Sequence, residues 1–231
     1  MSTRFKLVVF DCDGTLVDSQ HLIVSAMQRA FVGEGLLSPE RSAVLHTVGL
    51  SVLEAVCALS PSSGTDMQAR LAASYRDWCM TLRQQGAPLE PMFAGASAAL
   101  RRLAAEEQVV LGIATGKSRR GVARLVEAEG LGGIFSTIQT ADDAPSKPHP
   151  AMLQQAMAET GAEPAQTYMI GDSVFDMTMA VSAGVTPIGV SWGYHRAADL
   201  ERAGARHIVR SFTDLSQVLG MDGVSALVAA E

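Results

Sequence analysis

The sequence predicts an α/β fold, a Rossmann-like doubly wound parallel sheet with a small helical cap domain inserted after the first strand. Short β-rich runs alternate with helical stretches along most of the chain, as expected when helices cover both faces of a parallel sheet. The alternation stops between residues 19 and 88, where apolar residues recur with helical spacing and no convincing strand is found. The expected strands are Lys6–Phe10, Val109–Ala114, Phe135–Gln139, Thr167–Ile170, Thr186–Val190 and His207–Val209.

The stretches between the later strands carry helix signals. Between residues 95 and 107, alanine and leucine recur at helical spacing. The stretch from Pro150 to Thr160 begins with a proline, which is favoured in the first helical turn, and precedes Gly161, which is favoured just beyond a helix end. Helices at both places would cover the sheet.

The cap is expected to be entirely helical. Its clearest signal is a set of apolar residues at offsets of 0, 4, 7, 8 and 11, which share one helix face: Leu71, Tyr75, Trp78, Cys79 and Leu82. Breaks are expected at residues 33–39 and 60–64, where glycine, proline and serine occur. We therefore predict a cap domain of residues 19–88 and a Rossmann-like core of residues 1–18 and 89–231, joined on the return path by "GAPLEPMFAG".

Composition indicates a folded protein without a nucleic-acid or membrane role. Of 231 residues, 48% are hydrophobic and 18% are charged, which supplies enough apolar material for a core. The apolar runs fall short of the roughly 18 residues that a membrane helix needs. The net charge of −6 argues against nucleic acid or an anionic membrane as a partner. We expect a monomer or a homodimer.

The cysteines point to a reducing compartment. Cys12, Cys57 and Cys79 form neither an even disulfide set nor a C-x-x-C pair, and no secretory signal is recognised at the start of the sequence, so we expect a cytoplasmic protein. A cysteine phosphatase is disfavoured, because Asp18 stands where a C-x5-R loop starting at Cys12 requires arginine. A nucleotide-binding P-loop at "GIATGKS" is disfavoured too, because it requires glycine at position 111, which is leucine.

Polar residues follow several of the predicted strands at the point where each strand ends. Asp11 and Asp13 follow the first strand in "VVFDCDGTLVDS", Thr115 follows the second, and Asp172 follows the fourth. Lys147 lies in the loop after the third strand. Because the carboxyl ends of parallel strands share one edge of the sheet, where ligands bind, we expect these residues to meet there.

Carboxylates that converge at one point repel one another unless a hard cation neutralises them, and a site of oxygen ligands suits Mg²⁺. We expect Asp11 and Asp172 to bind Mg²⁺ through their side chains and Asp13 through its main-chain carbonyl. The carboxylate of Asp11 is also a suitable nucleophile towards phosphorus. Asp13 is placed to give a proton to the leaving oxygen and then to accept one from water.

Thr115, the main chain at Gly116, and Lys147 are expected to hold the phosphoryl oxygens, whose negative charge must be stabilised during transfer. Structural alternatives stay open at this point: Thr115 as a helix cap, Lys147 as a solvated loop lysine, and Asp172 as a helix cap. Three cations near the second strand, Lys117, Arg119 and Arg120, either attract the anionic substrate or simply face solvent.

These residues carry a family resemblance. The segments "DCDGTLVDS", "IATGKS", "SKPHP" and "GDSVFDMTMAVSAG" stand in the order of the four motifs of the haloacid dehalogenase superfamily, and the match spans about residues 5–195. The resemblance implies that Asp11 is the nucleophile, Asp13 the acid and base, and Asp172 a metal ligand. It further implies that Thr115 and Lys147 bind phosphate, and that Asp176 orients the metal shell or Lys147. Within the superfamily the sequence most resembles phosphoglycolate phosphatases.

The expected function is therefore a Mg²⁺-dependent phosphatase that hydrolyses a small phosphorylated metabolite through an aspartyl phosphate, with 2-phosphoglycolate as the leading substrate. A sugar-phosphate mutase and a pyrophosphatase of the same superfamily stay open as alternatives. A dehalogenase is less favoured, because Asp13 would have no evident task in it. A non-catalytic phosphate-binding protein is the alternative from a different class.

Overall fold

The computed structural model describes residues 5–85 and 90–220, and it has the predicted fold class. A six-stranded sheet has the order β3-β2-β1-β4-β5-β6, and every neighbouring pair is parallel. All six predicted strands are confirmed, three of them one residue longer than expected. Their bounds are β1 Lys6–Phe10, β2 Val109–Thr115, β3 Phe135–Thr140, β4 Thr167–Gly171, β5 Thr186–Val190 and β6 His207–Val209.

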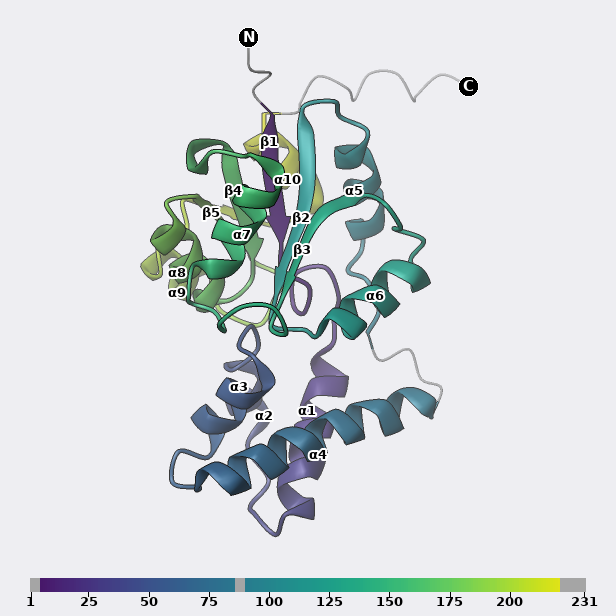
Figure 1. Cartoon of the computed structure of the whole chain (residues 1–231), viewed down its shortest axis with the longest axis vertical. Helices are drawn as coiled ribbons and strands as arrows, with labels where there is room; N and C mark the ends of the chain where they lie inside the picture. Colours follow the sequence, from purple (N-terminus) through teal and green to yellow (C-terminus); the bar gives the residue numbers. More distant parts are fainter. Residues whose placement is uncertain (1–4, 86–89, 221–231) are drawn as a thin grey trace.

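The central strand β1 is apolar on both faces because helices cover both faces of the sheet. Val8 and Phe10 point into one core layer, whereas Leu7 and Val9 point into the other, following the two-residue period of a strand. Helices α5 (Ala96–Ala104) and α10 (Phe212–Val218) pack on the first face, and α7 (Ala151–Thr160) and α8 (Val174–Ala183) pack on the second (Figure 1).

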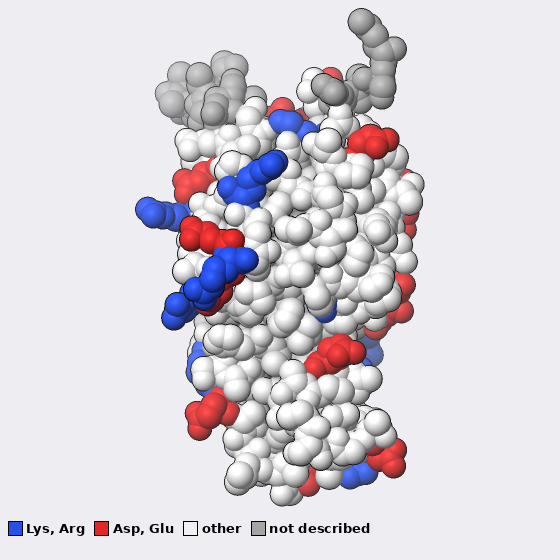
Figure 2. All heavy atoms as spheres, turned by 90° about the vertical axis from the view of Figure 1, so that its left-hand side faces the viewer, with Lys and Arg blue, Asp and Glu red and all other residues white. Residues whose placement is uncertain are grey.

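The remaining elements of the core complete the alternation. They are α6 (Arg119–Ala128), the short 3-10 helix η1 (Pro164–Gln166) and α9 (Ala197–Arg202). The two helices expected at residues 95–107 and 150–160 are confirmed as α5 and α7, each shorter than its predicted stretch. On the face shown in Figure 2, basic and acidic side chains both occur mainly along the edges.

The predicted helical insertion forms four helices that lie beyond the carboxyl ends of the strands (Figure 1). They are α1 (Gln20–Gly33), α2 (Arg41–Leu45), α3 (Val52–Leu59) and α4 (Thr65–Gln84). The expected breaks after Gly33 and between α3 and α4 are present, and a further break separates α2 from α3. Buried side chains from all four helices form one apolar cluster that includes Met27, Val44, Val56 and Leu71.

The boundary predicted at residues 88 and 89 lies outside the described residues, so the division into two domains stays a prediction. The monomeric or dimeric state and the cytoplasmic location stay predictions as well. Among the helices of residues 5–85 and 90–220, none combines the length and the apolar character that crossing a bilayer requires.

Candidate active site

Asp11 stands directly after β1, at the carboxyl edge of the sheet. The last residue of β1 lies opposite Ile113 of β2 and Ile170 of β4, so the three central strands end side by side. Thr115 is the last residue of β2, and Asp172 directly follows β4. The parallel register thus brings residues that are far apart in sequence to one edge, as the sequence predicts.

Three buried carboxylates gather at this edge. Asp11, Asp172 and Asp176 each offer an oxygen, and these oxygens all lie within 4.8 Å of one another. The loop after β1 fits closely around Asp172: Gly14 has a φ of +84°, and a Cβ atom at this position would lie 2.2 Å from Oδ2 of Asp172. The Thr15 hydroxyl donates a hydrogen bond of 2.9 Å to Oδ1 of Asp172. The first motif therefore both supplies Asp11 and orients Asp172.

Lys147 is buried against two of these carboxylates. Its Nζ atom lies 2.6 Å from Oδ1 of Asp176 and 3.0 Å from Oδ1 of Asp11, and the residue is only 1% exposed. Burial by itself lowers the pKa of Lys147, but the charges of Asp11 and Asp176 outweigh it, and the pKa lies above its ordinary value. Lys147 is thus a fixed cation of the site and not a solvated loop residue.

The site holds more negative charge than Lys147 can balance. Burial, together with the charge of Asp176, raises the pKa of Asp11 to about 6 against the opposing effect of Lys147. Burial, then Asp176 and Asp11, raise the pKa of Asp172 well above its usual range. Among the described residues, Oδ2 of Asp11 is buried without a hydrogen-bond partner. An unpartnered carboxylate oxygen beside two more buried carboxylates fits a hard divalent cation.

Helix capping is carried out by serines in this region, not by Thr115 or Asp172. Ser173 is the N-cap of α8 and accepts a hydrogen bond from the main-chain N–H of Asp176. The Asp176 carboxylate in turn accepts hydrogen bonds from the Ser173 N–H and hydroxyl, at 3.1 and 2.6 Å. Ser118 caps α6 in the same way. Asp172 and Thr115 are consequently not needed as caps, whereas Asp176 belongs both to a capping box and to the acidic cluster.

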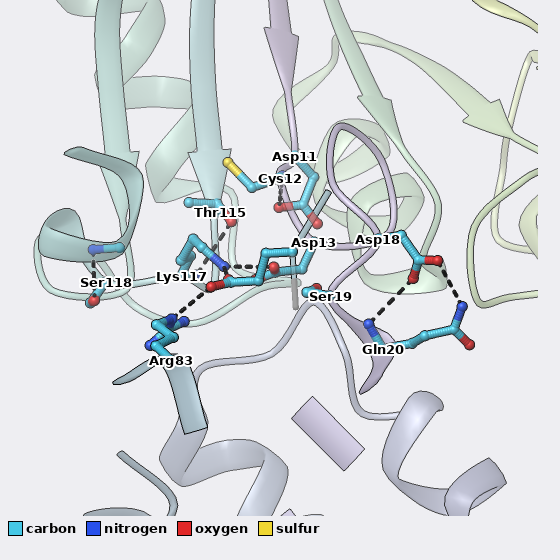
Figure 3. A network of polar contacts seen from close by, with 12 residues as sticks. Asp11, Cys12, Asp13, Asp18, Ser19, Gln20, Arg83, Thr115, Lys117 and Ser118 are labelled. Carbon is cyan, nitrogen blue, oxygen red and sulfur yellow. Dashed lines mark hydrogen bonds and ion pairs between the residues drawn. The ribbon is translucent and has the colours of Figure 1, made fainter. Parts of the chain in front are cut away.

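Asp13 belongs to a second chain of polar contacts, shown in Figure 3. Lys117 Nζ lies 2.7 Å from Oδ1 of Asp13 and 2.8 Å from Oε1 of Glu90. Glu90 Oε2 accepts a hydrogen bond of 2.6 Å from Nε of Arg83, a residue of α4. Although burial alone raises the pKa of Glu90, Lys117 and Arg83 lower it to about 2. This chain of ion pairs connects the predicted acid and base to a helix of the cap.

No motif in the sequence predicted this second network of ion pairs. Glu90 is a single acid in the return segment, and Arg83 is one of several cations on α4, so neither belonged to a recognisable motif. Lys117 is largely buried between two carboxylates, which differs from both sequence interpretations. Arg119 forms an exposed ion pair of 2.7 Å with Asp143, as expected of a surface arginine.

The cap approaches the core edge closely at Gly116. A Cβ atom at this position would lie 2.4 Å from the carbonyl oxygen of Leu50, which belongs to the loop between α2 and α3. The main-chain N–H of Ser51, in the same loop, donates a hydrogen bond of 2.8 Å to the hydroxyl of Ser146 in the core. Between cap and core lies a cavity of about 440 Å³, lined on the core side by residues that include Asp11, Asp13, Thr115 and Gly116.

Cys12 does not line this cavity. It is fully buried in an apolar cluster with Ile113 and Val122, and burial raises the pKa of its thiol. A thiolate nucleophile is therefore disfavoured by geometry as well as by sequence.

The structure brings the predicted site residues into two adjoining groups. Asp11, Lys147, Asp172 and Asp176 form the buried charge cluster. Asp13, Thr115 and Gly116 line the cavity together with Asp11. The clustered carboxylate of Asp176 is an addition to the predicted metal ligands. The role predicted for the main-chain carbonyl of Asp13, as a ligand of Mg²⁺, stays a prediction.

Known proteins with similar sequences cover nearly the whole chain. The family model described as haloacid dehalogenase-like hydrolase matches residues 8–190. The probable phosphatase IndB of Dickeya dadantii (strain 3937) is 36% identical over 212 residues, which make up 90% of this chain and 91% of that protein. A phosphoglycolate phosphatase of Yersinia pseudotuberculosis serotype I (strain IP32953) is 30% identical over 220 residues, 93% of each chain.

Solved structures show the same arrangement. The crystal structure of a hydrolase from Pseudomonas syringae superposes with a TM-score of 0.82 at 27% identity, covering 93% of this chain and 98% of that one. Because the superposition covers nearly all of both chains, the hydrolase from Pseudomonas syringae shares the sheet and the helical insertion.

Proposed function

The chain belongs to the haloacid dehalogenase-like hydrolases, and from this premise we propose that it is a Mg²⁺-dependent phosphatase that hydrolyses a small phosphorylated metabolite through an aspartyl phosphate on Asp11. The observation that carries the proposal is the position of Asp11. Its carboxylate lines the cavity, has one oxygen without a partner, and lies within the cluster of Asp172 and Asp176. A phosphatase function agrees with the names of the similar proteins.

The residues present fit a divalent cation. Asp11 and Asp172 would hold it through their side chains, Asp13 through its main-chain carbonyl, and Asp176 is near enough to contribute an oxygen or to orient the others. When bound, Mg²⁺ would neutralise the carboxylates and stabilise the charge on the transferring phosphoryl group. Lys147 pairs with both Asp11 and Asp176 and offsets part of their negative charge.

The chemistry of the chain's own residues then proceeds in two displacements. An Asp11 oxygen forms a bond to phosphorus while the bond from phosphorus to the alcohol oxygen breaks, and Asp13 gives that oxygen a proton. Asp13 next accepts a proton from a water molecule, which attacks the phosphorus and displaces the Asp11 carboxylate, so that phosphate is released. Thr115 and the main chain at Gly116 would bind the phosphoryl oxygens from the cavity side.

Lys117 contacts Oδ1 of Asp13, so Oδ2 is the oxygen that would carry the proton to the leaving group. Glu90 offers Lys117 a second carboxylate at 2.8 Å, so the lysine keeps an anionic partner when Asp13 is protonated. Lys117 and Glu90 are therefore positioning residues in this proposal.

The test is a screen for phosphate release from phosphorylated metabolites, including 2-phosphoglycolate, with and without EDTA. We expect release that EDTA stops, and we expect Asp11→Asn to lower kcat/KM by roughly 10⁴- to 10⁶-fold, as removal of a nucleophile does in other enzymes. Asp18→Asn, a change in the same loop at a residue that does not line the cavity, is the matched control and should retain release.

Other outcomes would identify the alternatives. Conversion of a hexose 1-phosphate without release of phosphate would indicate a mutase, and selective cleavage of pyrophosphate would indicate a pyrophosphatase. Halide release without Mg²⁺ would indicate a dehalogenase. Hydrolysis that survives Asp11→Asn unchanged would contradict the proposed intermediate, and phosphate binding without any turnover would support the non-catalytic alternative.

A further inference from the structure

The cavity between core and cap has two kinds of wall. The core side supplies the acids and the hydroxyl of the proposed chemistry, Asp11, Asp13 and Thr115. The cap side is mainly apolar, with side chains from α1, the loop before α3, α3 itself and α4. These cap residues are Leu22, Ile23, Met27, Val48, Leu50, Val52, Ala55, Ala73 and Met80.

The charged residues that line the cavity do not offset this apolar wall. Arg83 is paired with Glu90, and Lys117 is paired with Glu90 and Asp13, so these four charges neutralise one another. Of the other charged residues of the lining, Asp11 belongs to the buried cluster, and Arg76, Asp77, Arg120 and Arg124 are exposed to solvent. The buried and half-buried side chains on the cap side of the cavity are therefore mainly apolar.

On the basis of the proposed phosphatase function, we propose that the substrate is a phosphate monoester whose alcohol carries an apolar body larger than glycolate, packed against Ile23, Leu50 and Val52 of the cap. These three residues are half-buried and so present accessible apolar surface to the cavity. Burial of hydrocarbon against such a wall is favourable, whereas burial of an unpaired carboxylate is costly.

The size of the cavity supports the same substrate class. Its volume of about 440 Å³ falls within the roughly 300–1,000 Å³ of pockets that enclose drug-sized ligands. A phosphoryl group on a two-carbon acid would leave much of that space to water. An alcohol with a longer apolar body would fill it.

The test is a series of n-alkyl phosphates from ethyl to hexyl phosphate, measured by phosphate release beside 2-phosphoglycolate. All members have nearly the same leaving-group basicity, so differences in kcat/KM report contact with the cavity wall. We expect kcat/KM to rise by about 3- to 4-fold for each buried methylene group, and to exceed the value for 2-phosphoglycolate at hexyl phosphate. A flat series with 2-phosphoglycolate preferred would overturn the proposal.

Two matched variants locate the effect. Ala73 and Ala69 are both exposed and lie one helical turn apart on α4, but only Ala73 lines the cavity. Ala73→Trp should lower the ratio of kcat/KM for hexyl phosphate to that for ethyl phosphate at least fivefold. Ala69→Trp should leave this ratio unchanged. Equal ratios in both variants would show that the hexyl chain does not occupy the cap cavity.

A binding measurement separates failure of this inference from failure of the proposed function. Ethylphosphonate and hexylphosphonate resist hydrolysis, and calorimetry can compare their Kd values in the presence of Mg²⁺. Tighter binding of hexylphosphonate, lost in Ala73→Trp, would support the apolar site even if no ester were hydrolysed. Hydrolysis of the esters with equal Kd values for both phosphonates would overturn the inference while leaving the phosphatase function intact.

Discussion

The core edge is held together by buried charges, whereas the cap is held together by apolar side chains. At the core edge, Lys147 and Asp176 form an ion pair whose side chains are both 0% exposed. In the cap, the pair Arg70–Glu34 leaves the arginine side chain 54% exposed, and an apolar cluster holds the helices together. Buried charge requires fixed partners, whereas an apolar surface tolerates many shapes. The comparison suggests that reaction chemistry is set by the rigid edge and substrate choice by the cap.

The largest contrast is expected when one cation is removed from each region. Lys147→Met would leave Asp11 and Asp176 buried without their partner, so the free energy of unfolding should fall by about 3–5 kcal/mol. Arg70→Met, in the exposed pair, should cost less than about 1 kcal/mol. Urea denaturation of both variants measures the two values. Equal losses would mean that the regions do not differ in the way described.

Removing the Asp176 charge as well tests whether unpaired buried charge explains the instability of Lys147→Met. In Lys147→Met, the additional change Asp176→Asn should recover part of the lost stability, because one fewer unpaired carboxylate is buried. No recovery would show that lost packing, and not lost charge compensation, destabilises Lys147→Met.

A metal effect should be confined to the core edge. Mg²⁺ at 100 times its Kd should stabilise the protein by about 2.7 kcal/mol if it binds only the folded state. Asp172→Asn should abolish this shift, whereas Asp142→Asn, at an exposed residue of the same sheet edge, should retain it. Thermal unfolding with and without EDTA provides the measurement. A shift that persists in Asp172→Asn would contradict the assignment of Asp172 as a ligand.

The metal-free core edge should also respond unusually to acid. Burial raises the pKa of Asp11 from 3.8 to about 6 on folding, so between these values the folded state binds more protons than the unfolded state. Stability in EDTA should therefore increase as the pH falls from 7.5 towards 5, by about 1.4 kcal/mol for Asp11 alone. Asp11→Asn should remove the contribution of Asp11 to this increase, and the remaining increase should come from Asp172, whose pKa is raised as well. A wild-type profile that falls over the same range would contradict the raised pKa.

The smallest effect is expected where the two regions meet. Arg83 and Glu90 have side chains that are 26% and 21% exposed, so their coupling in a double-mutant cycle should be about 0.5–1 kcal/mol. The variants Arg83→Met and Glu90→Gln, alone and combined, measure it by urea denaturation. Additive losses would show that the pair does not connect the cap to the network of Asp13.

The core edge was predictable from sequence because strand position and motif agree there. Asp11, Thr115 and Asp172 each follow an apolar run, and the parallel register brings the ends of such runs together. Lys147 was placed near this edge by its loop, although its burial was not foreseen. Asp176 was recognised only through the family resemblance, since its ion pair with Lys147 depends on how α8 packs.

The cap was predictable as a helical segment but not as a binding surface. The periodicity of Leu71, Cys79 and Leu82 gives the buried face of α4, and all three are buried. Which residues face the cavity depends on how the cap helices are oriented relative to the core. A single sequence carries no signal for this orientation. The pairing of Glu90 with Lys117 and Arg83 was missed for the same reason.

The missing side chain at position 116 determines how closely the cap can approach the core edge. The Leu50 carbonyl occupies the space that a methyl group would need. Even alanine at this position would therefore push the Leu50 loop away from the core edge. In the proposed mechanism, a wider gap at this place would admit solvent to the phosphorylated Asp11 from the cap side. Glycine at position 116 therefore permits the tight contact between the Leu50 loop and the core edge.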